Sequence, residues 1–206
     1  MRTWTVVLGI LLFGFDCRAQ DTYLNVMQRM SSQDAVSIEY AETRNLEFFQ
    51  EPWHGKGYVH ALAPDLMIKE QIEPERIVMA IIKDQLMYLD PDKGVRHQSR
   101  MDINNPLTLN ISLFKALVTN DSELLESLYR VLFYDNAEGW KMILIPVQDK
   151  LSKFKATITG TPGQPATQIE IEQPDGDSSK MTFGKKLFGA EAKAKIDQLV
   201  EELTGE

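Results

Sequence analysis

The sequence predicts a mainly β protein with added α-helices, in which an antiparallel sheet of about ten or eleven strands has helices packed against one face. Two observations predict this class. Apolar and polar residues alternate with a period of two in short segments from Ala35 onward, and turns rich in Pro, Asp and Gly separate them. One segment with helical spacing interrupts this pattern near the middle of the chain. With 206 residues, of which 43% are hydrophobic, the chain can form one domain with a substantial core.

Residues 1–19 are expected to be a cleaved export signal. Arg2 supplies the positive charge, and Thr5–Phe15 is an almost unbroken apolar stretch. This stretch is shorter than the roughly 20 residues that a membrane-spanning helix needs. Small residues at Cys17 and Ala19 fit a cut after Ala19. We therefore expect residues 20–206 to form a single exported domain.

Cys17 leaves a second processing route open, in which the cysteine is lipidated and anchors the protein to a membrane. That route needs a small residue just before the cysteine, and Asp16 stands there after the bulky Phe15. Cleavage after Ala19 is therefore preferred. Because Cys17 is the one cysteine of the chain, the mature protein would have no disulfide, and packing would have to stabilise it.

The first half of the mature chain is predicted to form one helix and six strands. Residues 21–32 have apolar residues at helical spacing, with Asp21 as the expected N-cap. Alternation with a period of two begins at Val36. In Arg76–Lys83 both faces are apolar, so this strand should lie inside the sheet and be covered on both sides. The other strands are expected at Gly57–Leu62, Leu66–Ile72, Gln85–Asp90 and Gly94–Ser99.

The second half begins with a helical segment at about residues 105–127. Asn105 is a suitable N-cap and Pro106 a suitable first helical residue, and an apolar stripe follows. A further amphipathic helix is expected at about residues 190–203. The strands between the two helices are expected at Leu128–Tyr134, Trp140–Ile145, Phe154–Thr159, Thr167–Glu172 and Lys180–Phe183.

No pattern in the sequence predicts catalysis, metal binding or nucleic-acid binding. The net charge of −8 disfavours a nucleic-acid surface. His54, His60 and His97 are dispersed, so we expect them at the surface rather than as metal ligands. Ser112 and Lys115 match the SxxK pattern of serine acyl-enzymes without its partner motifs, and are expected on the polar side of the central helix. We expect a binding protein that is not an enzyme and uses no cofactor or metal.

Methionine is abundant, with nine residues in the chain. Its flexible thioether side chain fills irregular cores and also adapts to varied apolar ligands. A curved sheet covered by an apolar helix can enclose a cavity suited to acyl chains. The composition permits such a cavity, and it equally permits a packed core.

Several segments follow one another in a recognisable order. They are Ile38-Glu39-Tyr40, Gly57-Tyr58-Val59, Ala63–Met67 (APDLM), Ile82–Pro91 (IKDQLMYLDP), the helix at Asn105-Pro106, and Gly139–Pro146 (GWKMILIP). In this order the chain resembles the periplasmic outer-membrane lipoprotein carrier family, the LolA-type proteins, and within it a divergent LolA-related branch. The resemblance runs from about Asp21 to Phe183.

The resemblance implies a half-open antiparallel β-barrel whose concave face is capped by helices. Such a protein holds the acyl chains of a lipoprotein, or of a related lipid, on the way to the outer membrane. The implied partners are the lipidated cargo, an inner-membrane release complex and an outer-membrane acceptor, and the carrier is expected to be a monomer. The family's latch arginine aligns with Ala63 and its cavity phenylalanine with Met67, which leaves the identity of the cargo and the opening of the lid undetermined.

Two alternatives stay open at this point. The chain could be an acceptor of the same fold that is anchored to the outer membrane through Cys17. It could instead be an interaction module whose interior is filled by its own side chains. For the carrier, alternation and the resemblance together place six residues in the hydrophobic cavity: Met67, Met79, Ile81, Leu113, Phe114 and Leu117.

Overall fold

The computed structural model describes residues 21–31, 34–47, 49–100, 106–148 and 154–205, with the backbone alone for 106–110. The expected signal peptide, its cleavage site, Cys17 and the proposed N-cap Asn105 lie outside the described residues. The strands are β1 (Val36–Asn45), β2 (Trp53–Leu62), β3 (Leu66–Glu73), β4 (Ile77–Ile82), β5 (Gln85–Asp90), β6 (Val95–Arg100), β7 (Tyr129–Asp135), β8 (Trp140–Pro146), β9 (Lys155–Gly160), β10 (Ala166–Glu172) and β11 (Ser178–Phe188). The helices are α1 (Tyr23–Met30), α2 (Pro106–Thr119), α3 (Ser122–Leu128) and α4 (Ala190–Thr204).

The eleven strands form one antiparallel sheet in the order β6-β5-β4-β3-β2-β1-β11-β10-β9-β8-β7. Each half of the chain forms a meander of neighbouring strands, and the pairing of β1 with β11 joins the two meanders. The sheet is open, because its edge strands β6 and β7 do not pair with each other. The predicted class, mainly β with about ten or eleven strands and capping helices, is confirmed.

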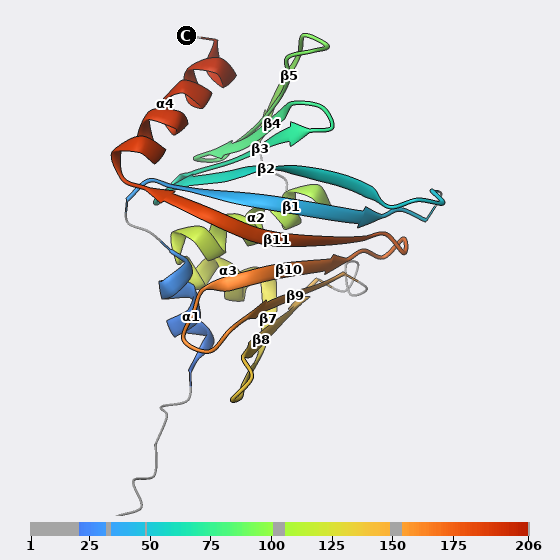
Figure 1. Cartoon of the computed structure of the whole chain (residues 1–206), viewed down its shortest axis with the longest axis vertical. Helices are drawn as coiled ribbons and strands as arrows, with labels where there is room; N and C mark the ends of the chain where they lie inside the picture. Colours follow the sequence, from blue (N-terminus) through green and yellow to red (C-terminus); the bar gives the residue numbers. More distant parts are fainter. Residues whose placement is uncertain (1–20, 32–33, 48, 101–105, 149–153, 206) are drawn as a thin grey trace, which may run out of the picture.

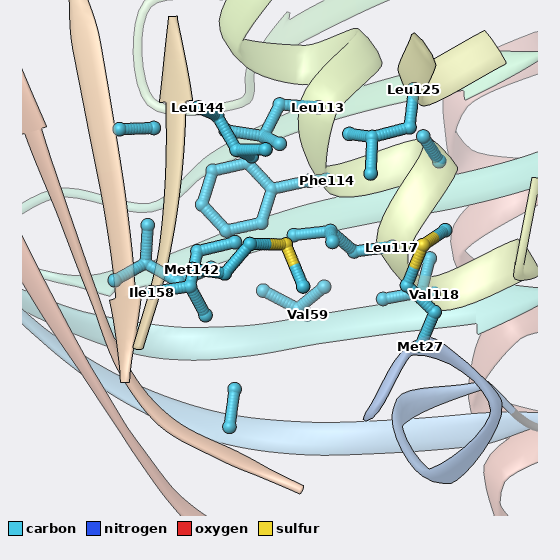
Figure 2. Close-up of a cluster of buried hydrophobic side chains, with 14 of the residues drawn as sticks. Met27, Val59, Leu113, Phe114, Leu117, Val118, Leu125, Met142, Leu144 and Ile158 are labelled. Atoms are coloured by element: carbon cyan, nitrogen blue, oxygen red, sulfur yellow. The ribbon is translucent and has the colours of Figure 1, made fainter. Parts of the chain in front are cut away.

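The sheet curves around α2 and α3, and its inner face holds the larger part of the core (Figure 1). Figure 2 shows side chains from α1, α2 and α3 meeting side chains from β2, β8 and β9. Leu113 of α2 and Met142 of β8 are fully buried there, as are Met27 of α1 and Leu125 of α3. The predicted leading and central helices thus cover the same face of the sheet.

Helix α4 packs on the opposite, outer face of the sheet, beside the upper strands in Figure 1. Its apolar residues are buried against apolar side chains of β3, β4 and β5. Val78 and Ala80 of β4 face α4, whereas Ile81 of the same strand faces the inner core. The prediction that this strand is covered on both faces is therefore confirmed, and α4 supplies one of the covers. None of the described helices is long and apolar enough to cross a membrane.

Some local predictions are corrected by the structure. The N-cap of α1 is Thr22 rather than Asp21, because the Thr22 hydroxyl accepts the backbone N–H of Asn25. Asp21 instead forms an ion pair with Arg29, with 2.6 Å between Oδ2 and Nη2. Strand β11 extends beyond the predicted end to Phe188, because residues 186–188 pair with the start of β1.

Candidate functional site

A cavity of about 470 Å³ lies between the inner face of the sheet and α2. This volume falls within the range of about 300–1,000 Å³ that small-molecule pockets occupy. Its apolar lining comes from β3, β4, β10, β11 and α2: Met67, Ile77, Met79, Ile111, Phe114, Ile169, Ile171 and Met181. Its polar lining includes Glu42, Arg44, Lys69, Gln71, Tyr88, Gln173, Asp177, Ser178 and Ser179. The cavity is therefore amphipathic.

The structure places the six predicted cavity residues in three different settings. Met67, Met79 and Phe114 line the cavity. Phe114 and Leu117 line a second pocket of about 30 Å³ between α2 and the start of β1. Ile81 and Leu113 line neither pocket and are fully buried in the inner core. A binding role for any of the six stays a prediction.

Phe114 lies at the boundary between the two pockets, since it and Ile169 line both of them. In Figure 2 the Phe114 ring points from α2 into the space between helix and sheet. Because the ring is 8% exposed, removing it would leave a void that neighbouring side chains fill only in part. Phe114 therefore contributes to the walls of both pockets.

Replacing Phe114 with alanine is expected to join the two pockets. The variant should lose about 3–5 kcal/mol of stability. Its preference for a long fluorescent acyl probe over a short one should be greater than that of the parent. Equilibrium denaturation measures the first effect, and paired titrations measure the second. Leu117→Ala is the control, because Leu117 lines the small pocket and not the large one. An unchanged ratio of the two dissociation constants in Phe114→Ala would contradict this expectation.

The polar end of the cavity contains a buried charged cluster, formed by Glu42, Arg44, Lys69 and Ser179. Glu42 Oε1 accepts from Arg44 Nε at 2.8 Å and from Ser179 Oγ at 2.7 Å. Glu42 Oε2 accepts from Arg44 Nη2 at 3.1 Å and from Lys69 Nζ at 2.6 Å. Arg44 also lies over the Trp53 ring, 4.4 Å from its centroid. The cluster is thus an ion-pair network built from three strands of the sheet.

The charges of this cluster depend on one another. Burial by itself raises the pKa of Glu42, but Lys69 and Arg44 outweigh that effect and lower the pKa to about 2. Burial lowers the pKa of Lys69, and the Glu42 carboxylate opposes this shift. Glu42 therefore stays ionised at neutral pH and is unsuited to act as a general base. Among the described residues, no group of three or more His, Cys, Asp or Glu side chains could hold a metal ion.

A second polar cluster lies on the outer face, and it corrects the surface position predicted for His60. The His60 side chain is 1% exposed, with Nδ1 2.7 Å from Ser37 Oγ and Nε2 3.5 Å from Glu70 Oε2. Ser37 is 2% exposed, so a substrate has no access to its hydroxyl in this conformation. Glu70 also pairs with Arg76, which in turn pairs with Glu202 of α4. This cluster fixes α4 to the sheet.

Ser112 corrects a second prediction. Its side chain is 1% exposed rather than on a polar face of α2, and Oγ has no hydrogen-bond partner among the described residues. Lys115 is half-buried and its ammonium lies 3.4 Å from the carbonyl oxygen of Lys83. Because Ser112 is enclosed, the SxxK match has no accessible nucleophile in this conformation.

The charged cluster was not predicted, although the sequence contains a signal for it. Val36, Ile38 and Tyr40 face the inner core, and the period of two along the same strand places Glu42 on that face as well. Likewise, Lys69 is two residues beyond the inward-facing Met67. Following the period of two beyond the apolar residues of each strand places both Glu42 and Lys69 on the inner face.

No family model matches this chain, and no curated protein matches it. Among solved structures, a LolA superfamily protein from Nitrosomonas europaea has a TM-score of 0.49 and 11% identity, over 82% of this chain and 93% of that chain. An outer-membrane lipoprotein-sorting protein domain from Vibrio parahaemolyticus has a TM-score of 0.47 and 10% identity, over 81% and 92%. The lipoprotein LppX of Mycobacterium tuberculosis has a TM-score of 0.39 and 12% identity, over 82% and 96%.

Proposed function

We propose that this protein is a non-enzymatic periplasmic carrier that binds the acyl chains of lipoproteins, or of related lipids, and carries them toward the outer membrane. The observation that carries the proposal is the cavity of about 470 Å³ between α2 and the inner face of the sheet. Its apolar lining includes three methionines, whose flexible side chains suit acyl chains of varied shape.

The physical reason for a carrier is the cost of exposing acyl chains to water. Burying an acyl chain contributes about 0.8 kcal/mol per methylene group. Ten buried methylenes would therefore supply about 8 kcal/mol before the cost of ordering the ligand is subtracted. A cavity with an apolar lining can supply this free energy in a compartment where a lipidated cargo has no other apolar surroundings.

The proposal includes the processing and the partners of the carrier. The mature carrier would begin after Ala19, act as a monomer, receive cargo from an inner-membrane release complex and deliver it to an outer-membrane acceptor. Ala63 stands where the resemblance places the latch arginine, so opening of α2 would depend on apolar contacts such as those of Phe114 and Leu117 rather than on that latch.

Native mass spectrometry of the protein purified from the periplasm tests this function. We expect a mature mass that starts after Ala19, together with a fraction that carries a lipid or an acylated peptide. In parallel, a fluorescent acyl probe should bind with saturation at one site per chain. A mature N-terminus at an acylated Cys17 would support the anchored acceptor instead. Absence of both co-purified lipid and probe binding would support the interaction module with a filled interior.

A further inference from the structure

In the charged cluster at the polar end of the cavity, the carboxylate of Glu42 can accept no further hydrogen bonds, whereas Lys69 and Arg44 still have N–H groups to donate. Four donor atoms contact the two oxygens of Glu42, which accounts for about all the lone pairs of a carboxylate. Lys69 donates from Nζ to Glu42 and Arg44 donates from Nε and Nη2. An ammonium has three N–H groups and a guanidinium five, so both cations keep unused donors among their described contacts.

The cluster also has an excess of positive charge. It contains two cations and one carboxylate, and both cations line the cavity. Asp177 is the other acidic residue of the lining, but its Oδ1 accepts the backbone N–H of Glu47 at 2.8 Å. No ion pair joins Asp177 to Arg44 or Lys69 among the described residues. The charge of Asp177 is thus not part of the network that holds the cations.

This polar end adjoins the apolar end within the same cavity. Lys69 follows Met67 on the inward-facing side of β3, and Met67, Met79 and Phe114 continue the lining toward α2. The side chain of Lys69 is 12% exposed and that of Glu42 is 4% exposed, whereas Arg44, at 35%, lies where the site opens to solvent. An ionised group that enters this end therefore meets cations in surroundings poor in water, where charge-assisted hydrogen bonds are stronger than at an open surface.

We infer that the ligand of the cavity is an amphiphile with a negatively charged head, a carboxylate or phosphate, that binds to Lys69 and Arg44 while its chain lies along Met67, Met79 and Phe114. This inference rests on the proposed function, because it names the class of lipid that the carrier takes. A cationic head would find no free acceptor on Glu42, and an uncharged head would leave the unused donors of Lys69 and Arg44 without an anionic partner.

Competition between matched amphiphiles tests the inference separately from the proposed function. A bound fluorescent acyl probe is displaced by dodecyl phosphate, dodecanol or dodecyltrimethylammonium, each below its aggregation threshold, and by inorganic phosphate alone. We expect dodecyl phosphate to compete about tenfold more strongly than dodecanol, dodecyltrimethylammonium to be the weakest of the three, and inorganic phosphate to have no effect. Equal competition by all three amphiphiles would overturn the head-group inference and leave the carrier intact. Failure of the probe to bind would overturn the proposed function itself.

A substitution in the charged cluster tests whether its residues cause the preference for dodecyl phosphate over dodecanol. Lys69→Met keeps an unbranched apolar side chain and leaves Glu42 paired with Arg44, so that the buried carboxylate keeps a cationic partner. This variant should lose about tenfold in affinity for dodecyl phosphate and keep the affinity for dodecanol. Lys180→Met is the matched control, because Lys180 pairs with Glu170 and does not line the cavity. Retention of the dodecyl phosphate preference in Lys69→Met would overturn the inference.

Discussion

Replacing Leu113 with glutamate is expected to unfold the protein. Leu113 has no solvent exposure and belongs, like Leu144, to the inner core (Figure 2). Shortening a buried leucine costs about 2–5 kcal/mol, and an unpaired carboxylate in the same apolar place costs more. A total loss of about 4 kcal/mol or more is a large part of the 5–15 kcal/mol that stabilises a typical domain.

Denaturant titration followed by circular dichroism measures this effect. Leu113→Met is the matched control, since it preserves the volume and should cost less than about 1.5 kcal/mol. If Leu113 were instead a lid residue that lines the cavity, the glutamate variant would keep the denaturation midpoint of the parent and lose the binding of acyl probes alone.

Acid is expected to weaken the folded state in a defined pH range. The pKa of Glu42 is lowered from 4.5 to about 2, because Lys69 and Arg44 more than offset the effect of burial. The pKa of Glu70 is also lowered to about 2, where hydrogen bonds from His60 and Arg76 outweigh burial. Above about pH 5 both carboxylates are ionised in the folded and unfolded chain, and their stabilisation is complete.

As the pH falls below 4.5, the unfolded chain takes up these protons first, so the free energy of unfolding decreases until about pH 2. Each carboxylate contributes about 3 kcal/mol over this range, since one pKa unit corresponds to about 1.36 kcal/mol. Urea titrations at several pH values from about 7 down to about 2 bracket the transition. Glu42→Gln should remove about half of this pH dependence, which is about 3 kcal/mol.

Glu172→Gln is the control for this measurement. The Glu172 side chain is 54% exposed and pairs with Lys155 at the surface, where an ion pair contributes little to stability. This variant should keep the acid dependence of the parent. A Glu42→Gln protein with the same acid dependence as the parent would show that the buried network does not stabilise the fold in this way.

The sequence predicted the sheet well because strand alternation is a local property. Residues 76–83 are apolar on both faces, and β4 is indeed covered by the inner core and by α4. Strand ends were predicted less well, because they depend on partners far along the chain. The additional residues at the end of β11 pair with β1, about 150 residues away in the sequence, and no local pattern contains that pairing.

The candidate site was predicted in part for a related reason. Met67, Met79 and Phe114, which alternation and the resemblance had suggested, line the cavity, and their role in binding stays a prediction. Leu113 is apolar like its neighbour Phe114, but the two side chains leave α2 in different directions, and only Phe114 lines the cavity. The charged cluster was missed because charged side chains are expected at the surface, although alternation along each strand places Glu42 and Lys69 inward. Their contact, 2.6 Å from Lys69 Nζ to Glu42 Oε2, depends on the pairing of the strands.

The unpaired edges of the sheet have a mechanical consequence. In a closed barrel, any increase in girth must break backbone hydrogen bonds between strands. Here β6 and β7 share no such bonds, so the wall can spread or tighten around its contents while each of its ten strand-to-strand ladders stays intact. Spreading then costs only contacts between side chains, which are individually weak and can be replaced by contacts with whatever enters. The gap in pairing between β6 and β7 therefore lets the interior change its width without local unfolding.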